Sequence, residues 1–209
     1  MADGAAGRCT VLLVAPSPTL SVGQWRALMA QVPAAEHPRI DGLRRPQDRL
    51  NSATGWQLLH RLSRSHGTTL QRGADGRPRC TPPADVSLSH SGSWVGVALC
   101  PDGRVGIDVE TVRDVSPSLA RRALSTHELS WIHQVPPGRS RDHRFFRLWT
   151  AKEAFLKATG VGLTSDPRSV TIDCTAEEPV LLGQEEAWTF SASAPADGVC
   201  ATVCVERAP

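Results

Sequence analysis

Two carboxylates stand two residues apart in the segment Gly106-Ile-Asp108-Val-Glu110. The apolar residues alternate here, which predicts a β-strand over residues 105–109 with both acids on one face. The two side chains would leave that strand about 7 Å apart, close enough to repel unless water or a cation lies between them. For this pair alone, a solvated outer face of an edge strand is the better explanation, because the pattern is common.

A third carboxylate lies in the segment from Trp149 to Lys157, which contains both lysines of the chain, Lys152 and Lys157; the other 21 basic residues are arginines. In the helix predicted over residues 144–159, Glu153 and Lys157 project within about 40° of each other. A lysine ammonium can approach one oxygen end-on, which suits a small anionic target such as a phosphate oxygen, although the base composition of a high-GC genome would also make lysine scarce.

Two strand carboxylates and one helix carboxylate form a set of oxygen ligands that Mg²⁺ accepts, with water and substrate phosphates completing the shell. Oxygen ligands do not discriminate Mg²⁺ from Mn²⁺. We therefore predict a divalent metal site at Asp108, Glu110 and Glu153.

Two upstream segments carry further polar groups. Ser89-His90-Ser91 is expected in a turn between strands 86–88 and 94–99, where hydroxyls and an imidazole could hold an anion. Gly76-Arg77-Pro78 reads as a tight turn.

The elements that position these residues form two similar halves. In the first half, the periodicity predicts a strand at 9–15, helices at 22–32 and 46–65, and strands at 86–88 and 94–99. In the second half, it predicts a strand at 105–109, helical segments at 117–134, with a break near Ser125, and at 144–159, and strands at 170–174, 188–192 and 199–205. An α+β fold follows, with a boundary near Asp102 between halves 1–102 and 103–209.

Taken together, these motifs resemble the 4′-phosphopantetheinyl transferase family, in its larger pseudo-dimeric type. That family shows G-K-P, then S-H-S, then G-(I/V)-D-(I/V)-E, then W-x-x-K-E-(A/S)-x-x-K, in the order found here from about Arg45 to Leu163. The resemblance implies an intramolecular pseudo-dimer with the active site in the cleft between the halves. It also implies transfer of phosphopantetheine from coenzyme A to a serine of an acyl or peptidyl carrier protein, which releases adenosine 3′,5′-bisphosphate and serves polyketide and nonribosomal peptide biosynthesis.

The resemblance also implies a role for each residue. Asp108, Glu110 and Glu153 would be the metal ligands, with Glu153 and Lys157 catalytic. The predicted coenzyme A contacts are Arg45, Arg49, Gly76, Arg77, Pro78, Ser89, His90, Asp108, Lys152 and Lys157. The sequence departs from the family pattern at Arg77, where lysine is usual, and at Asn51, where arginine is common.

Composition limits the other functions. The net charge of +2 and the aromatic content of 5% argue against a nucleic-acid-binding module, and no apolar run is long enough to cross a bilayer. The N-terminus lacks the pattern of a signal peptide, so we expect a cytoplasmic protein, monomeric because it is already pseudo-dimeric, whose six cysteines are mainly buried thiols rather than disulfides or zinc ligands. The alternative activity is a magnesium-dependent phosphohydrolase that acts on a nucleotide pyrophosphate without a carrier protein; an inactive relative is disfavoured by the intact acidic residues.

Overall fold

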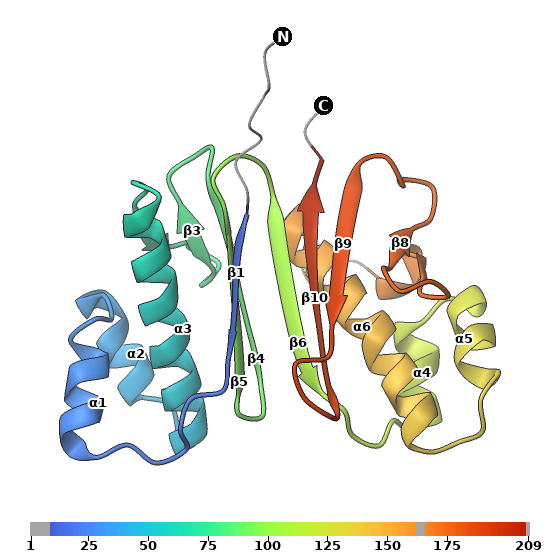
Figure 1. The fold of residues 1–209 in the computed structure, drawn as a ribbon, viewed down its shortest axis with the longest axis horizontal. Coiled ribbons are helices and arrows are strands. Elements are labelled where there is room, and N and C mark those ends of the chain that lie inside the picture. The colour runs from blue at the N-terminus through green and yellow to red at the C-terminus, as the bar shows by residue number, and fades with distance from the viewer. Residues whose placement is uncertain (1–8, 162–165, 208–209) are drawn as a thin grey trace, which may run out of the picture. The chain divides into compact units, whose positions relative to one another are not determined.

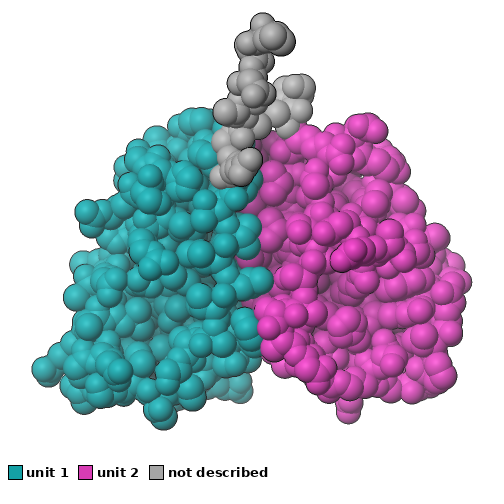
Figure 2. Space-filling view, in the orientation of Figure 1, with its two compact units in different colours: residues 1–102 teal, residues 103–209 magenta. Residues whose placement is uncertain are grey.

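The computed structural model describes residues 9–161 and 166–207. The chain divides into two compact units, Met1–Asp102 and Gly103–Pro209, which Figure 2 colours separately. Each unit has hydrophobic clusters of its own, built entirely from its own residues.

Unit 1 is a three-stranded antiparallel sheet of order β1-β5-β4 with helices on one face (Figure 1). Its elements are β1 (Thr10–Val14), α1 (Val22–Met29), a 3₁₀ turn (Ala34–Glu36), α2 (His37–Asp41), α3 (Pro46–Ser65), the small hairpin β2 (Leu70–Arg72) and β3 (Pro78–Cys80), β4 (Asp85–Ser91) and β5 (Trp94–Cys100). The long helix α3 packs its leucines against Val95, Val97 and Leu99 of the central strand.

Unit 2 has a sheet of order β6-β10-β9. Its elements are β6 (Val105–Thr111), α4 (Pro117–Ala123), α5 (Thr126–His133), α6 (Arg139–Thr159), a 3₁₀ turn (Pro167–Ser169), the short pair β7 (Ile172–Asp173) and β8 (Val180–Leu181), β9 (Trp188–Ser193) and β10 (Val199–Glu206). Helix α6 lies across β6 and β10 (Figure 1).

The two units repeat one chain order. In each, the first strand is an edge, short helices and one long helix follow, a small two-stranded sheet comes next, and the last strand enters the centre of the main sheet. The predicted α+β fold of two similar halves is therefore confirmed at the level of each half, while the predicted cleft between them stays a prediction.

Local sequence explains the main helix boundaries. Pro46 opens α3 at a position where its missing N–H has no helical partner. Ser125 forms a capping box with Glu128 at the start of α5, which confirms the predicted break, and Gly160 ends α6 with a φ of 73°. Helix α6 begins at Arg139, five residues before the predicted start of 144. The prediction missed this first turn because the polar residues 139–143 show no apolar periodicity.

Several segments differ from expectation, including the 3₁₀ turn at Ala34–Glu36, α2 and β8, which were not predicted. The hairpin β2–β3, which carries Gly76, was too short to give a strand pattern, and β4 continues through Ser91 rather than turning at His90. The strand predicted at 170–174 is reduced to Ile172–Asp173. No described helix has the length and apolarity needed to cross a membrane.

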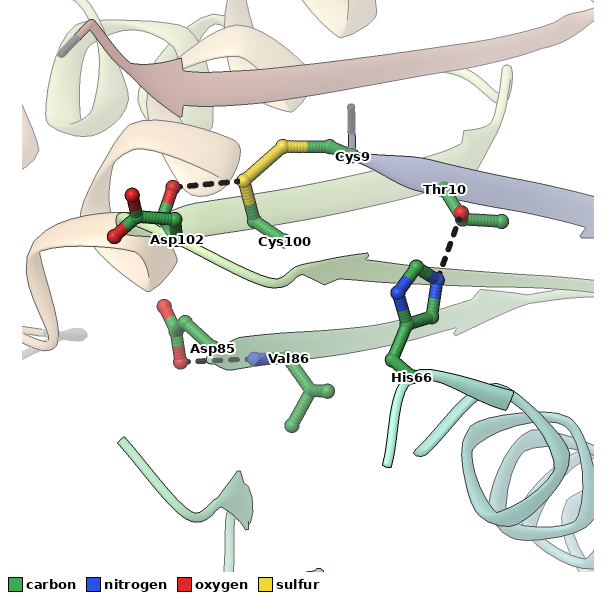
Figure 3. Close-up of a disulfide and its surroundings, with 7 residues drawn as sticks. All are labelled: Cys9, Thr10, His66, Asp85, Val86, Cys100 and Asp102. Atoms are coloured by element: carbon green, nitrogen blue, oxygen red, sulfur yellow. Dashed lines mark hydrogen bonds between the residues drawn. A yellow bond between two sulfur atoms is a disulfide. The ribbon is translucent and has the colours of Figure 1, made fainter. Parts of the chain in front are cut away.

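The predicted thiol state of Cys9 and Cys100 is wrong, because the two form a disulfide (Figure 3). Thr10 pairs with Leu99 in the antiparallel register, so Cys9 falls directly opposite Cys100, with 4.1 Å between their Cα atoms. Sequence alone does not reveal which strands pair. The other four cysteines are buried thiols, as predicted.

Candidate active site

Gly106 sets how closely α6 approaches β6. A Cβ built on Gly106 would lie 1.8 Å from the carbonyl oxygen of Ala154 and 2.7 Å from the nitrogen of Ala158. This contact also identifies the faces of the strand: Gly106, Asp108 and Glu110 share the face toward α6, since alternate residues of a strand point the same way. The glycine of the Gly-x-Asp-x-Glu motif thus brings the carboxylates under the helix.

Lys157 joins the helix to the strand. Its Nζ donates to Asp108 Oδ1 at 2.7 Å and to the carbonyl oxygen of Ile107 at 3.0 Å. Asp108 is 5% exposed, whereas the Lys157 side chain keeps 22% exposure. The ammonium therefore offsets a nearly buried carboxylate and can still reach an anion from solvent.

The second strand carboxylate, Glu110, is bound by Arg113 Nη1 at 2.9 Å. Glu153 lies one helical turn before Lys157 and so projects from the same side of α6. Within unit 2, the three predicted carboxylates thus come from two elements in direct contact.

The predicted metal ligands fit Mg²⁺ by type but are not assembled as a cage. Carboxylate oxygens are its preferred ligands. Among the residues that the structure describes, however, no three His, Cys, Asp or Glu side chains form a group that could hold a metal ion. The ion pairs of Asp108 with Lys157 and of Glu110 with Arg113 occupy part of that set.

Lys152 was predicted to contact coenzyme A, and the structure places it elsewhere. Its side chain is 0% exposed and pairs with the equally buried Glu128 at 2.7 Å. The Nζ also donates to the carbonyl oxygens of Pro167, at 2.8 Å, and Val170. Burial lowers the pKa of Lys152, and the hydrogen bond that its ammonium donates to Glu128 opposes that shift. We therefore assign Lys152 to the interior of unit 2 rather than to the ligand.

Ser89 and His90 lie in unit 1 near the end of β4, and they leave it on opposite faces because they are consecutive strand residues. Ser89 is buried and His90 is exposed. Asn51 of α3 fixes the following turn by donating to the carbonyl oxygen of Gly92 at 2.9 Å. If both Ser89 and His90 contact coenzyme A, they contact different groups of it.

The turn Gly76-Arg77-Pro78 joins β2 to β3 in unit 1. Gly76 has a φ of 82°, which favours glycine, and the carbonyl oxygen of Arg77 accepts a hydrogen bond from Gly73 N at 2.7 Å. Asp75 Oδ1 accepts from Arg77 N at 3.1 Å, and this bond, with the Arg79 side chain, holds the pKa of Asp75 below its usual range. The turn is therefore rigidly built.

The predicted arginine contacts sit at the start of α3. Arg45 is the exposed residue that precedes the helix, and Arg49 donates through Nε to the carbonyl oxygen of Leu43 at 2.6 Å. Arg45 is thus presented to solvent, while Arg49 also braces the loop before α3.

Two supporting residues were missed from the sequence. Glu128 gave a signal only as a capping residue, and nothing in the sequence marked it as the partner of Lys152. Arg72, which binds both Glu36 and the Gly76 turn, gave no signal among so many arginines.

Comparison with known proteins agrees with the motifs. Residues 104–204 match the model of the 4′-phosphopantetheinyl transferase superfamily. The chain is 38% identical over 99 residues to the 4′-phosphopantetheinyl transferase psf-1 of Bacillus pumilus, covering 46% of this chain and 42% of that protein. It is 36% identical over 121 residues to HetI of Nostoc sp., covering 57% and 50% respectively.

These matches span about half the length of each of those curated relatives. A longer match, to pptA of Paxillus involutus, is 27% identical and covers 76% of this chain and 71% of that protein. Among solved structures, the holo-[acyl-carrier-protein] synthase of Thermotoga maritima is 27% identical with a TM-score of 0.42, over 51% of this chain and 64% of that one.

Proposed function

Since residues 104–204 match the 4′-phosphopantetheinyl transferase superfamily, we propose that the chain is a member that transfers the 4′-phosphopantetheine group of coenzyme A to a serine hydroxyl of an acyl or peptidyl carrier protein. One observation supports this most strongly. Gly106 lets α6 lie directly on β6, so that Lys157 reaches Asp108 and the two specific motifs of the family form one local structure.

The reaction forms a bond between the serine oxygen and the β-phosphorus of coenzyme A and breaks the bond from that phosphorus to the bridging oxygen. Adenosine 3′,5′-bisphosphate leaves with the electron pair. We assign the serine proton to Glu153, directly or through one water, and such general-base help is typically worth about 10²–10⁴ in rate. Lys157 would place positive charge beside the diphosphate, where negative charge develops.

We propose Asp108, Glu110 and Glu153 as the ligands of Mg²⁺, with Mn²⁺ as a substitute. Their oxygen atoms are of the right type, and they come from two packed elements of unit 2. The ion would supply positive charge to the diphosphate of coenzyme A. Titration calorimetry with Mn²⁺ should show binding that Asp108→Asn weakens.

In unit 1, we assign the phosphates of coenzyme A to Ser89, His90 and Arg45, and its adenine side to the turn of Gly76, Arg77 and Pro78. The rigid turn and the exposed positions of His90 and Arg45 support this assignment. We also assign Arg49 to coenzyme A, through its Nη groups, since its Nε donates to the carbonyl oxygen of Leu43.

The test is to incubate the protein with coenzyme A, Mg²⁺ and several apo carrier proteins and to weigh the carriers. A gain of one phosphopantetheine is expected for at least one carrier. Unchanged carriers together with release of adenosine 3′,5′-bisphosphate would instead indicate the phosphohydrolase, which the comparisons do not favour.

Lys157→Arg tests whether the site needs a compact ammonium. A guanidinium is too broad to bind Asp108 and the Ile107 carbonyl in the same space, so transfer should fall by about tenfold or more. The measurement is kcat/KM for coenzyme A. Full activity would contradict the role given to Lys157.

We further propose that the protein acts as a cytoplasmic monomer on carrier domains of polyketide or nonribosomal peptide synthases. Light scattering of the purified protein with and without a carrier would test the monomer.

A further inference from the structure

We propose that Arg72 is a positioning residue for the nucleotide side of coenzyme A, acting through the turn of Gly76, Arg77 and Pro78. The inference rests on the proposed function only in assigning that turn to the adenosine part of the ligand. The contacts that support this role lie inside unit 1, and no sequence motif predicted them.

Arg72 ends β2 and uses its whole guanidinium. Nε lies 3.0 Å from both carboxylate oxygens of Glu36, and Nη2 also binds Glu36 Oε2. Nη1 donates to the carbonyl oxygen of Gly76. The planar fork thus binds the carboxylate through Nε and Nη2 and the carbonyl through Nη1, so that three nitrogens on one rigid group hold the two partners.

The partners of Arg72 are themselves fixed. Glu36 is 3% exposed, and its 3₁₀ turn runs directly into α2. The Arg72 guanidinium carbon lies 4.6 Å from the ring centroid of Trp56, which is 3% exposed in α3. With the Glu36 carboxylate at its Nε/Nη2 edge and the Trp56 ring under its central carbon, the guanidinium has little freedom.

The consequence falls on the turn. Gly76 is held from one side by Arg72, while Arg77 is held by Gly73 and Asp75. The hairpin has only three paired residues on each strand, too few to be stable by itself. Leu70 and Cys80 anchor the far end of the hairpin in the core of unit 1, and Arg72 ties the turn itself to Glu36 and to Trp56 of α3.

A loose turn should weaken binding of the nucleotide part of the ligand and leave binding of its diphosphate part unchanged. The probes are adenosine 3′,5′-bisphosphate and inorganic pyrophosphate, each titrated by calorimetry with Mg²⁺ into the full chain. For Arg72→Leu we expect the Kd of adenosine 3′,5′-bisphosphate to rise about tenfold, equivalent to one hydrogen bond to a charged group. The Kd of pyrophosphate should stay within twofold of the wild-type value.

Further variants separate positioning from general damage. Glu36→Gln keeps the shape of the Arg72 partner and removes its charge, so it should shift the same Kd in the same direction by a smaller factor, even if Arg72→Leu does not fold. Arg72→Lys should not restore the wild-type Kd, because one ammonium nitrogen replaces the three guanidinium nitrogens that bind Glu36 and Gly76. Arg61→Leu, at an exposed position of α3, is the control and should change neither Kd.

Equal weakening of both probes, or an unchanged Kd for adenosine 3′,5′-bisphosphate in both Arg72→Leu and Glu36→Gln, would overturn the inference. Failure of the proposed function has a different signature. In that case carriers gain no mass, whereas the nucleotide binding and its dependence on Arg72 are still measured.

Discussion

At the scale of single residues, Gly106 tolerates an added side chain least among the glycines that the structure describes. Any side chain there meets the backbone of α6 and not a movable side chain, because the nearest atoms are the Ala154 carbonyl oxygen and the Ala158 nitrogen. The helix would have to move away from β6, and with it Glu153 and Lys157. Packing at one glycine thus controls the geometry of the candidate site.

Gly106→Ala should therefore cost about 3 kcal/mol or more of stability, the upper range for overpacking, and should abolish transfer. Urea unfolding and the carrier mass assay measure the two effects. Gly23→Ala is the matched control, since its added Cβ would meet nothing closer than 4.0 Å in α1 and the change should be neutral or slightly stabilising. A fully stable, active Gly106→Ala protein would refute the close approach.

The four free thiols should be unreactive in the folded protein. Burial raises the pKa of Cys174 to about 12 and that of Cys200 to about 11, and it also raises the pKa of Cys80 and Cys204. Because the thiolate is the reactive form, iodoacetamide at pH 8 should label none of them until the protein is unfolded. Rapid labelling of Cys174 in the native protein, read by mass spectrometry, would contradict this burial.

The two lysines show how far single residues could be predicted. The sequence placed both in one helix next to Glu153, and it supported an anionic partner for each. In the structure, Lys157 forms an ion pair with Asp108, and Lys152 forms one with Glu128, which lies 24 residues upstream. Helical spacing predicts which side of α6 a residue faces, but it does not reveal which element covers that side.

At the scale of elements, the buried pair of Lys152 and Glu128 connects three segments of unit 2. Glu128 accepts from Ser125 N, at the start of α5, and from Ile172 N in β7, each within 2.8 Å. Lys152 in α6 adds the carbonyl oxygens of the 3₁₀ turn and of Val170. All these groups are satisfied together, so loss of one partner leaves the others buried without it.

Lys152→Met should therefore destabilise the protein by about 3–5 kcal/mol, the usual cost of leaving one buried charge uncompensated. The double variant Lys152→Met with Glu128→Gln removes both charges and should recover part of that loss. The single variant Lys152→Arg should also be less stable than the wild type, because the larger guanidinium does not fit a site that is 0% exposed. Chemical denaturation of the variants measures each step, and additive effects of the two substitutions would argue against a coupled pair.

Elements with strong local signals were predicted well, and short ones were not. Pro46, Ser125 and Gly160 mark helix ends by their own chemistry, so the limits of α3, the break before α5 and the end of α6 follow from the sequence. The β2–β3 hairpin has three residues in each strand, and its pairing depends on Arg72 and on contacts far along the chain. Periodicity does not detect such a segment.

At the scale of the molecule, the two units share one topology but not one chemistry. Strand β1 occupies in unit 1 the place of β6 in unit 2, and its sequence Thr-Val-Leu-Leu-Val has no carboxylate. The predicted acidic ligands therefore belong to unit 2 alone, whereas unit 1 offers the Gly76 turn and the end of β4. The repeat was invisible in the sequence because the units share strand order rather than residues.

The disulfide lies entirely within unit 1. It joins Cys9, next to β1, to Cys100 of β5 across a separation of 91 residues. In the chain-entropy model, closing a loop of that length lowers the entropy of the unfolded chain and so stabilises the folded state by about 4–5 kcal/mol at room temperature. Because each unit has its own hydrophobic clusters, reduction should act first on unit 1. Hydrogen exchange with and without dithiothreitol should show lost protection in β1, β5 and α3 and retained protection in β6, β10 and α6. Cys9→Ser should reproduce the effect without reductant, while equal loss in both units would mean that they unfold as one.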